Sequence, residues 1–129
     1  MNVLSPGRRP QATPLRASVD VSDPDGPLIR VVGELAYATC APLRDEVERV
    51  LADAPPTLVL DFGDLHFIDS TGLAVIVHAW REGREVGTTL RLRGVPPFLA
   101  SILDITGVAG LLARPAHAWP GEQRPAATG

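Results

Sequence analysis

The run Asp69-Ser70-Thr71-Gly72 places one carboxylate and two hydroxyls between the apolar segment Leu58-Val59-Leu60 and a segment with helical spacing that starts at Leu73. A helix that begins there presents backbone N–H groups without partners and a partial positive charge. A hydroxyl at this point could accept a phosphoryl group, and the roughly −1.5 to −2 charges of a phosphate at pH 7 would change the local surface. The run is therefore a candidate switch site.

The same residues also have plainer roles. Asp, Ser and Thr all cap helices well, so Asp69, Ser70 or Thr71 could simply be the N-cap. Capping and phosphorylation are compatible, because a phosphate on Ser70 would still lie near the helix N–H groups. Gly72 costs helix propensity in a first turn. It indicates either the close approach of a partner or tight packing of the helix start on a sheet, and the sequence leaves both open.

The sequence gives little support to a catalytic role. Ser70, His78 and Asp61 have the residue types of a hydrolytic triad, but His78 follows Ser70 by eight residues on one helix, about 12 Å along its axis. All 12 basic residues are Arg, so chemistry that needs a lysine is excluded. The residues that could bind a metal ion cluster most closely at Asp61, Asp64, His66 and Asp69. Their spacing is neither that of a zinc site nor that of an EF-hand. We expect no enzyme activity, no metal and no cofactor.

The composition of the whole chain sets further limits. Its 129 residues are 45% apolar but only 5% aromatic, which predicts one domain with an aliphatic core. A net charge of −3 argues against general binding of nucleic acid. Cys40 is the single cysteine, so an intrachain disulfide is impossible. No apolar run approaches the roughly 20 residues needed to span a bilayer, and the N-terminus lacks the apolar core of a signal peptide. We expect a cytoplasmic protein without membrane contact.

The elements that would position the switch run alternate along the chain. Residues 1–14 and 115–129 are rich in proline and predict flexible tails around one folded domain, 15–114. Periodicity predicts strands over 16–21, 28–32, 57–61 and 88–92, and helices over 39–53, 70–86 and 97–104, with Thr39 as the first N-cap. Residues 107–112 read as a turn with a short apolar closure. The order β-β-α-β-α-β-α favours parallel pairing with helical crossovers.

Helical spacing also predicts which side chains form the core. One stripe comprises Leu43, Val47, Val50 and Leu51, a second comprises Leu73, Ile76, Val77 and Trp80, and a third comprises Phe98, Ile102 and Leu99. The strand Leu58-Val59-Leu60 is too apolar for a wet face, which predicts a sheet covered on both sides at this point.

The run from Leu58 to Ile76, centred on Asp69-Ser70-Thr71-Gly72-Leu73, resembles the signature of STAS domains. The likeness is closest to the bacterial anti-sigma factor antagonists. It continues in Gly33-Glu34-Leu35, in Leu90-Arg91-Leu92 and in the helix end Ile102 to Val108, so that it covers residues 28–112. After Leu112 the final strand and helix usual in the family look truncated or degenerate.

The resemblance implies an α/β fold, a single STAS-like domain whose small mixed β-sheet has helices packed mainly on one face. It also implies partner switching, in which Ser70 is phosphorylated by an anti-sigma factor that is also a serine kinase. The unphosphorylated form binds that partner and frees the sigma factor, and a serine phosphatase resets the phosphorylated form. Thr71 is a second-choice phosphoacceptor. The alternative is a STAS-type scaffold or transporter-associated module that phosphorylation does not regulate.

Together these arguments predict a binding face made of the loop 61–73 and the exposed start of the next helix, joined by residues at the earlier strand end. Its members are Glu34, Tyr37, Asp64, His66, Asp69, Ser70, Thr71 and Gly72. For Glu34 and Tyr37, ordinary exposure at a strand end is the competing explanation. The sequence does not decide whether the domain binds nucleotide or forms a homodimer.

Overall fold

The computed structural model describes residues 14–23 and 26–113. The strands are β1 (Arg16–Asp20), β2 (Leu28–Leu35), β3 (Thr57–Ile68) and β4 (Thr89–Arg93). The helices are α1 (Ala41–Leu51), α2 (Ser70–Glu85), α3 (Pro97–Ile105) and α4 (Val108–Leu112). The predicted tails, 1–14 and 115–129, lie outside the described residues apart from Pro14. In the part of the chain that is described, no helix is long and apolar enough to cross a membrane.

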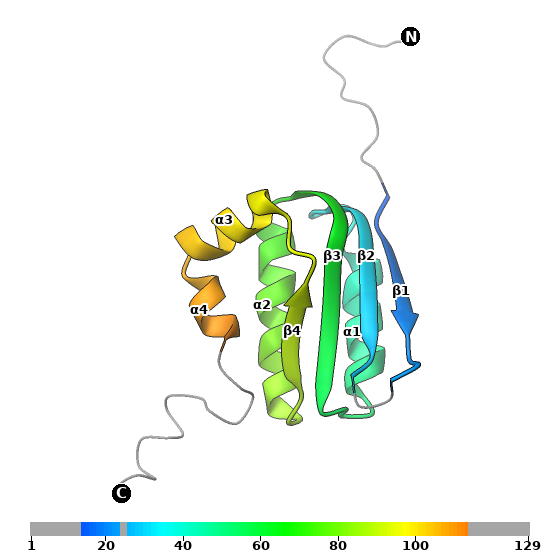
Figure 1. Ribbon diagram of the computed structural model, residues 1–129. Helices are drawn as coiled ribbons and strands as arrows, with labels where there is room; N and C mark the ends of the chain where they lie inside the picture. The colour runs from blue at the N-terminus through cyan, green and yellow to red at the C-terminus, as the bar shows by residue number, and fades with distance from the viewer. Residues whose placement is uncertain (1–13, 24–25, 114–129) are drawn as a thin grey trace, which may run out of the picture.

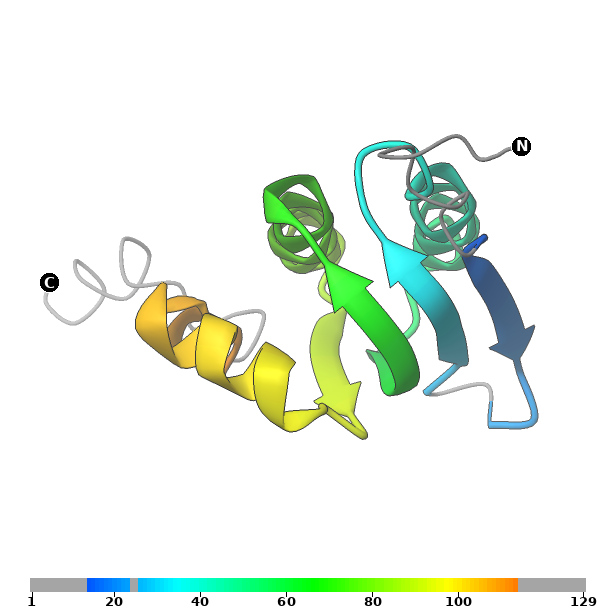
Figure 2. The same ribbon diagram turned by 90° about the horizontal axis from the view of Figure 1, so that it is seen from above.

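The four strands form one mixed sheet in the order β1-β2-β3-β4 (Figure 1). β1 pairs with β2 in the antiparallel sense, whereas β2 with β3 and β3 with β4 are parallel pairs. Parallel neighbours need a crossover, and α1 and α2 provide it. Both helices cover the same face of the sheet, while α3 and α4 lie beside the β4 edge (Figure 2). The predicted α/β fold, with helices mainly on one face, is confirmed.

The core lies between this face of the sheet and the two crossover helices. The stripe predicted on α1 is buried in full. On α2 the prediction is right for Ile76 and Trp80, but Leu73 and Val77 are only half-buried while Val75 and Ala79 are buried. Fully burying one aliphatic side chain contributes about 1.5–3 kcal/mol. The α2 stripe that faces the sheet is therefore rotated from the predicted one, so that Leu73 packs only partly against the core and Val77 is half-buried.

The second half of β3 corrects the predicted loop 61–73. Residues 62–68 continue the strand, and two register shifts against β2 absorb the extra residues of β3. A bulge adds one residue to one strand and reverses the alternation beyond it. The period-2 pattern of a strand therefore does not appear in this part of the sequence. Val59 is half-buried rather than covered on both sides, because no helix among the described elements packs on the outer face of the sheet.

Three smaller predictions are also wrong. The N-cap of α1 is Cys40 rather than Thr39, whose hydroxyl accepts the Ala36 N–H at 3.0 Å and donates to the Glu34 carbonyl at 2.6 Å. On α3, the prediction is wrong for Phe98, which is exposed, and right for Leu99, which is buried; Ile102 is half-buried, and Leu103 is buried in addition. The turn predicted over 107–112 contains the helix α4, which begins after Gly107 at a φ of 80°.

Candidate functional site

Asp69 is the single residue between β3 and α2, and it is the N-cap of α2. Its Oδ1 accepts the N–H of Gly72 at 2.9 Å, and its Oδ2 accepts the N–H of Tyr37 at 3.1 Å. The Gly72 N–H, followed by those of Tyr37 and Thr71, holds the pKa of the Asp69 carboxyl below its ordinary value, against an opposing effect of burial. One charged carboxylate thus fixes the start of α2 and ties it to the loop between β2 and α1.

Ser70 is the first residue of α2, and its side chain is exposed. Because Asp69 supplies the cap, the hydroxyl of Ser70 is not needed to satisfy the helix N-terminus. It makes no hydrogen bond to any residue that the structure describes. Of the three capping candidates in the sequence, only the carboxylate acts as the cap, and Ser70 Oγ is left accessible to solvent.

Gly72 faces inward and is buried. A Cβ atom at this position would overlap the carbonyl oxygen of Leu35 and would lie 2.7 Å from Cγ1 of Ile68. These contacts come from the ends of β2 and β3. Of the two alternatives for this glycine, the structure shows tight packing of the helix start on the sheet, and a contact between Gly72 and a partner stays a prediction.

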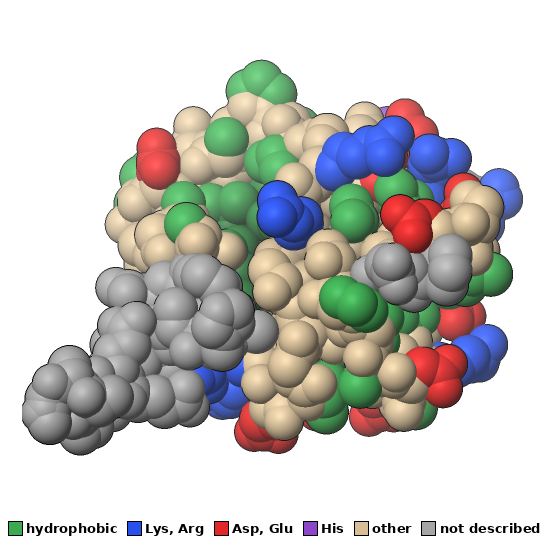
Figure 3. Space-filling model, turned by 60° about the horizontal axis from the view of Figure 1, so that its bottom comes forward, with side chains coloured by type: hydrophobic (Ala, Val, Ile, Leu, Met, Phe, Trp, Pro, Cys, Tyr) green, Lys and Arg blue, Asp and Glu red, His purple; other side chains and the backbone are tan. Residues whose placement is uncertain are grey.

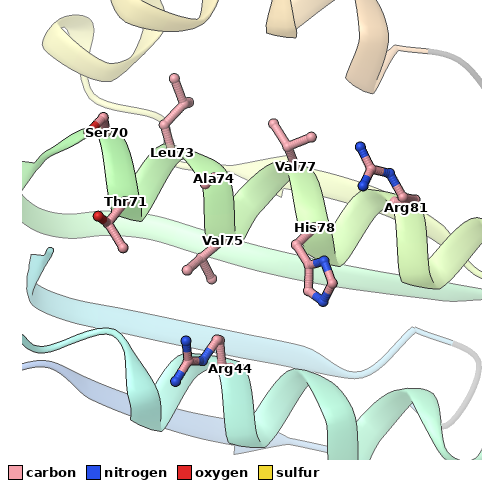
Figure 4. A pocket seen from close by; sticks show the side chains of 9 residues that line it. All are labelled: Arg44, Ser70, Thr71, Leu73, Ala74, Val75, Val77, His78 and Arg81. Carbon is pink, nitrogen blue, oxygen red and sulfur yellow. The ribbon is translucent and has the colours of Figure 1, made fainter. Parts of the chain in front are cut away.

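The outward surface of α2 forms one side of a shallow groove of about 660 Å³ (Figure 4). Leu73, Ala74 and Val77 give it an apolar floor, with a cationic Arg81 at the far end of the helix. The groove also includes Arg44, which extends from α1. An apolar surface flanked by guanidinium groups, with a free hydroxyl at one end, is suited to contact with another protein.

Sequence reasoning missed these groove residues or assigned them to the core. The available signal was the width of the apolar region of α2, in which apolar residues occupy nearly every position from Leu73 to Trp80. A surface helix needs one apolar stripe, and a helix that is apolar over most of its circumference has a second face to bury. No comparable signal in the sequence pointed to Arg44, because its place in the groove depends on how α1 packs beside α2.

Exposed aromatic side chains gather at the same end of the fold as Ser70. Tyr37 in the β2–α1 loop is 81% exposed, Phe67 near the end of β3 is 46% exposed, and Phe98 at the start of α3 is 38% exposed. These three segments meet at the end of the molecule where α2 begins (Figure 1). The other aromatic residues within the described chain, Phe62 and Trp80, are buried. These three residues, here called the aromatic rim, share one end of the fold with Ser70, and Phe67 lies on the outer face of the sheet because it pairs with Glu34 in register.

The remaining predicted site residues lie on the other side of the sheet. In register, Asp64 pairs with Val32 and Glu34 pairs with Phe67. Register partners point to the same face of a sheet, and the buried residues of β2, such as Val31 and Leu35, define the opposite, helix-covered face. Glu34 and Asp64 therefore lie on the outer face, while Ser70 and Thr71 belong to the helix layer. His66 is exposed and is the residue of β3 that the second register shift leaves without a partner on β2. The predicted binding face is split in two by the sheet.

Asp61, at the start of the predicted loop, is a structural residue. Its Oδ1 accepts a hydrogen bond from the Gly63 N–H at 2.9 Å. Its Oδ2 lies 3.5 Å from Nη2 of Arg30 and 3.7 Å from Nε of Arg93. The carboxylate is 8% exposed, whereas both guanidinium groups are largely in solvent. Basic side chains lie in a row on one side of the molecule, with acidic ones close by (Figure 3). Asp61 joins β2 to β4 across β3 and is not free for a partner.

Comparison with known proteins adds independent information. The sequence model of a family described as "Mlab, STAS domain" matches residues 19–113. The anti-sigma-B factor antagonist of Bacillus subtilis (strain 168) is 26% identical over 99 residues, which cover 76% of this chain and 90% of that protein. The anti-sigma-B factor antagonist of Listeria monocytogenes is 29% identical over 84 residues, which cover 65% and 74% of the two chains.

Solved structures agree with the fold. An anti-sigma factor antagonist from Mycobacterium paratuberculosis superposes with a TM-score of 0.64 at 26% identity, over 75% of this chain and 81% of that one. The Bacillus cell fate determinant SpoIIAA in its phosphorylated form gives a TM-score of 0.60 at 21% identity, over 74% and 86% of the two chains. The second likeness is one of fold alone.

Proposed function

The chain belongs to the STAS domain family, and from this premise we propose that it is an anti-sigma factor antagonist controlled by phosphorylation. The unphosphorylated form binds an anti-sigma factor that is also a serine kinase, and the sigma factor is released. The kinase transfers the γ-phosphoryl group of ATP to Oγ of Ser70, the hydroxyl loses its proton and ADP leaves. The modified form no longer binds, and a serine phosphatase restores it by hydrolysis. In this proposal the protein is a kinase substrate and not itself an enzyme.

The observation that carries the proposal is the free hydroxyl of Ser70 at the start of α2. Ser70 is exposed while its neighbour Asp69 performs the capping that a serine here would otherwise provide. A phosphoryl group could therefore be added without removing a hydrogen bond that the fold needs. The names of the Bacillus and Listeria relatives support the role of antagonist.

A phosphate on Ser70 would act on the partner interface rather than on the fold. It would add roughly −1.5 to −2 charges at the rim of the apolar groove formed by Leu73, Ala74 and Val77. A partner that covers this groove would have to desolvate the phosphate, and a buried charge without a matched cation is costly. Binding is lost without any refolding, which suits a rapid and reversible switch.

The aromatic rim supplies the anchoring contacts in this proposal. Tyr37 and Phe98 offer large apolar surfaces at the end of the fold where Ser70 lies, and aromatic residues are common among the few that dominate the energy of an interface. Tyr37 is also coupled to the start of α2, because its N–H shares the Asp69 carboxylate with Gly72. We therefore expect Tyr37→Ala to weaken binding of the anti-sigma factor.

The test is intact-mass spectrometry of the protein purified from its native host under growth and under stress. The wild type should show a species heavier by one phosphate, and Ser70→Ala should abolish it. Ser22→Ala is the matched control, since Ser22 is an exposed serine that follows β1 at the opposite end of the sheet from the start of α2, and it should leave the phosphorylated species intact. Absence of phosphate under every condition would instead favour a constitutive scaffold or a transporter-associated module.

A further inference from the structure

The two neighbouring hydroxyls at the start of α2 point to different sides of the helix. Ser70 lies on the side of α2 next to α3, in line with Leu73, Val77 and Arg81 (Figure 4). Thr71 lies on the side next to α1, in line with Val75 and His78 (Figure 4). The helical repeat gives the same division, because residues three, four and seven apart share one side of a helix. The two positions therefore have different surroundings, although they are adjacent in sequence.

Arg44 faces Thr71 across the groove. It extends from α1 toward the start of α2, and both side chains line the same groove (Figure 4). Among the residues that the structure describes, Arg44 makes no ion pair and no hydrogen bond through its side chain. The acidic residues Glu48, one helical turn after Arg44 on α1, and Glu82 on α2 line an adjoining pocket that Arg44 also lines. An arginine without an ion pair among the described residues thus lines the same groove as Thr71, on the side of α2 that faces α1.

We infer that the guanidinium group of Arg44 pairs with a phosphate carried on Thr71, and that a phosphate on Ser70, which lies on the other side of α2, does not form this pair. A guanidinium group pairs with phosphate through two parallel N–H···O bonds, which is the strongest geometry available to an arginine. The other basic side chains in this groove are Arg81, which lies at its far end, and His78, whose Nε2 lies 3.0 Å from a carboxylate oxygen of Glu82. Arg44 is therefore the group that a phosphate at position 71 would meet.

The two modifications would then have different consequences. A phosphate on Ser70 stays exposed and adds negative charge to the face that a partner covers. A phosphate on Thr71 pairs with the guanidinium group of Arg44. The pair links α1 to α2 and neutralises the positive charge that Arg44 contributes to the groove. This inference deepens the proposed function and rests on it for its biological use, because it concerns the regulation of the same site. The pairing itself is a property of the isolated protein and can be tested without an anti-sigma factor.

The experiment is a pH titration of the phosphate, followed by phosphorus NMR, in the full-length protein carrying phosphothreonine at position 71. A free phosphate has a second pKa of about 6. A neighbouring cation favours the dianion, so the pKa should be lower by about 0.5–1 pH unit with Arg44 present than in the Arg44→Gln variant. Glutamine has a helix propensity close to that of arginine, and Arg44 is exposed, so the variant keeps α1 intact.

Two controls separate pairing from a general effect of charge. Arg81→Gln removes an arginine from the same groove and should leave the pKa of the phosphate at position 71 unchanged. With phosphoserine at position 70, Arg44→Gln should likewise have no effect. The inference is overturned if Arg44→Gln does not change the pKa at position 71, or if Arg81→Gln changes it equally. Either result would leave the role of Ser70 in partner binding untouched, since that role is measured with the anti-sigma factor.

Discussion

Replacing Gly72 with alanine should damage the junction between α2 and the sheet. In the first turn of α2 the chain passes so close to the end of β2 that a Cβ would overlap the Leu35 carbonyl oxygen. It would also lie 2.7 Å from Cγ1 of Ile68 and 2.9 Å from Cγ of Leu35. The side-chain atoms could rotate away, but the carbonyl belongs to the backbone of β2 and could yield only if a strand or the helix moved.

The expected magnitude is a balance of two effects. Alanine is favoured over glycine inside a helix by up to about 1 kcal/mol, and forcing an extra methyl group into a packed site costs about 1–3 kcal/mol. Because one of the atoms in the way is a backbone oxygen, we place the cost in the upper part of that range. The net result for Gly72→Ala is a free energy of unfolding lower by about 1–2 kcal/mol.

Urea denaturation followed by circular dichroism measures this change, and Gly110→Ala is the matched control. Gly110 also lies within a helix, but a Cβ there would have nothing within 4 Å, so that variant should be as stable as the wild type or slightly more stable. Hydrogen exchange of the amide at position 72 should also become faster, since the bond to Asp69 lengthens. If both alanine variants proved equally stable, the close packing of α2 on β2 would be refuted.

Three further changes have expected outcomes. Asp69→Ala should lower the free energy of unfolding by about 0.5–2 kcal/mol in urea titrations, because the cap is lost. The fold lowers the pKa of Asp69 from its ordinary value of about 3.9. The contribution of the charged carboxylate to the free energy of unfolding is therefore complete above that ordinary value and is lost as the pH falls through the folded pKa. Asp69→Asn should flatten this part of the curve of stability against pH. Ala54→Gly should raise the free energy of unfolding by about 0.5–1 kcal/mol, since Ala54 has a φ of 44° that glycine adopts more easily. Thr88→Val should lower it by about 1–3 kcal/mol in thermal melts, because the buried hydroxyl donates to the Pro55 carbonyl at 2.6 Å and that carbonyl would lose its partner.

Much of the fold could be predicted from local patterns. The stripe on α1 has strict helical spacing, and prolines and glycines mark the ends of several elements, so α1, α2 and the four strands were found close to their places. The second half of β3 could not be found, because its two bulges break the alternation that identifies a strand. The short helix α4 was missed because five residues are too few for a periodic signal.

The site was only partly accessible to sequence reasoning. The types and order of Asp69, Ser70 and Thr71 identified the switch run, but not which of them caps the helix. The division of the predicted face by the sheet, with Asp64 outside and Ser70 in the helix layer, depends on the register of β3 and follows only from the fold. Arg44 could not be foreseen, since it enters the groove from a helix that is distant in sequence.

The most direct test of partner switching is the affinity of the purified protein for the kinase-type anti-sigma factor that co-purifies with the Ser70→Ala variant. Titration calorimetry would compare the unmodified chain with the same chain carrying phosphoserine at position 70. We predict that the phosphate weakens binding by at least about tenfold, or about 1.4 kcal/mol, while Ser22→Glu, which adds charge at the opposite end of the sheet, has little effect. Equal affinities of the modified and unmodified chains would contradict the proposed switch at Ser70.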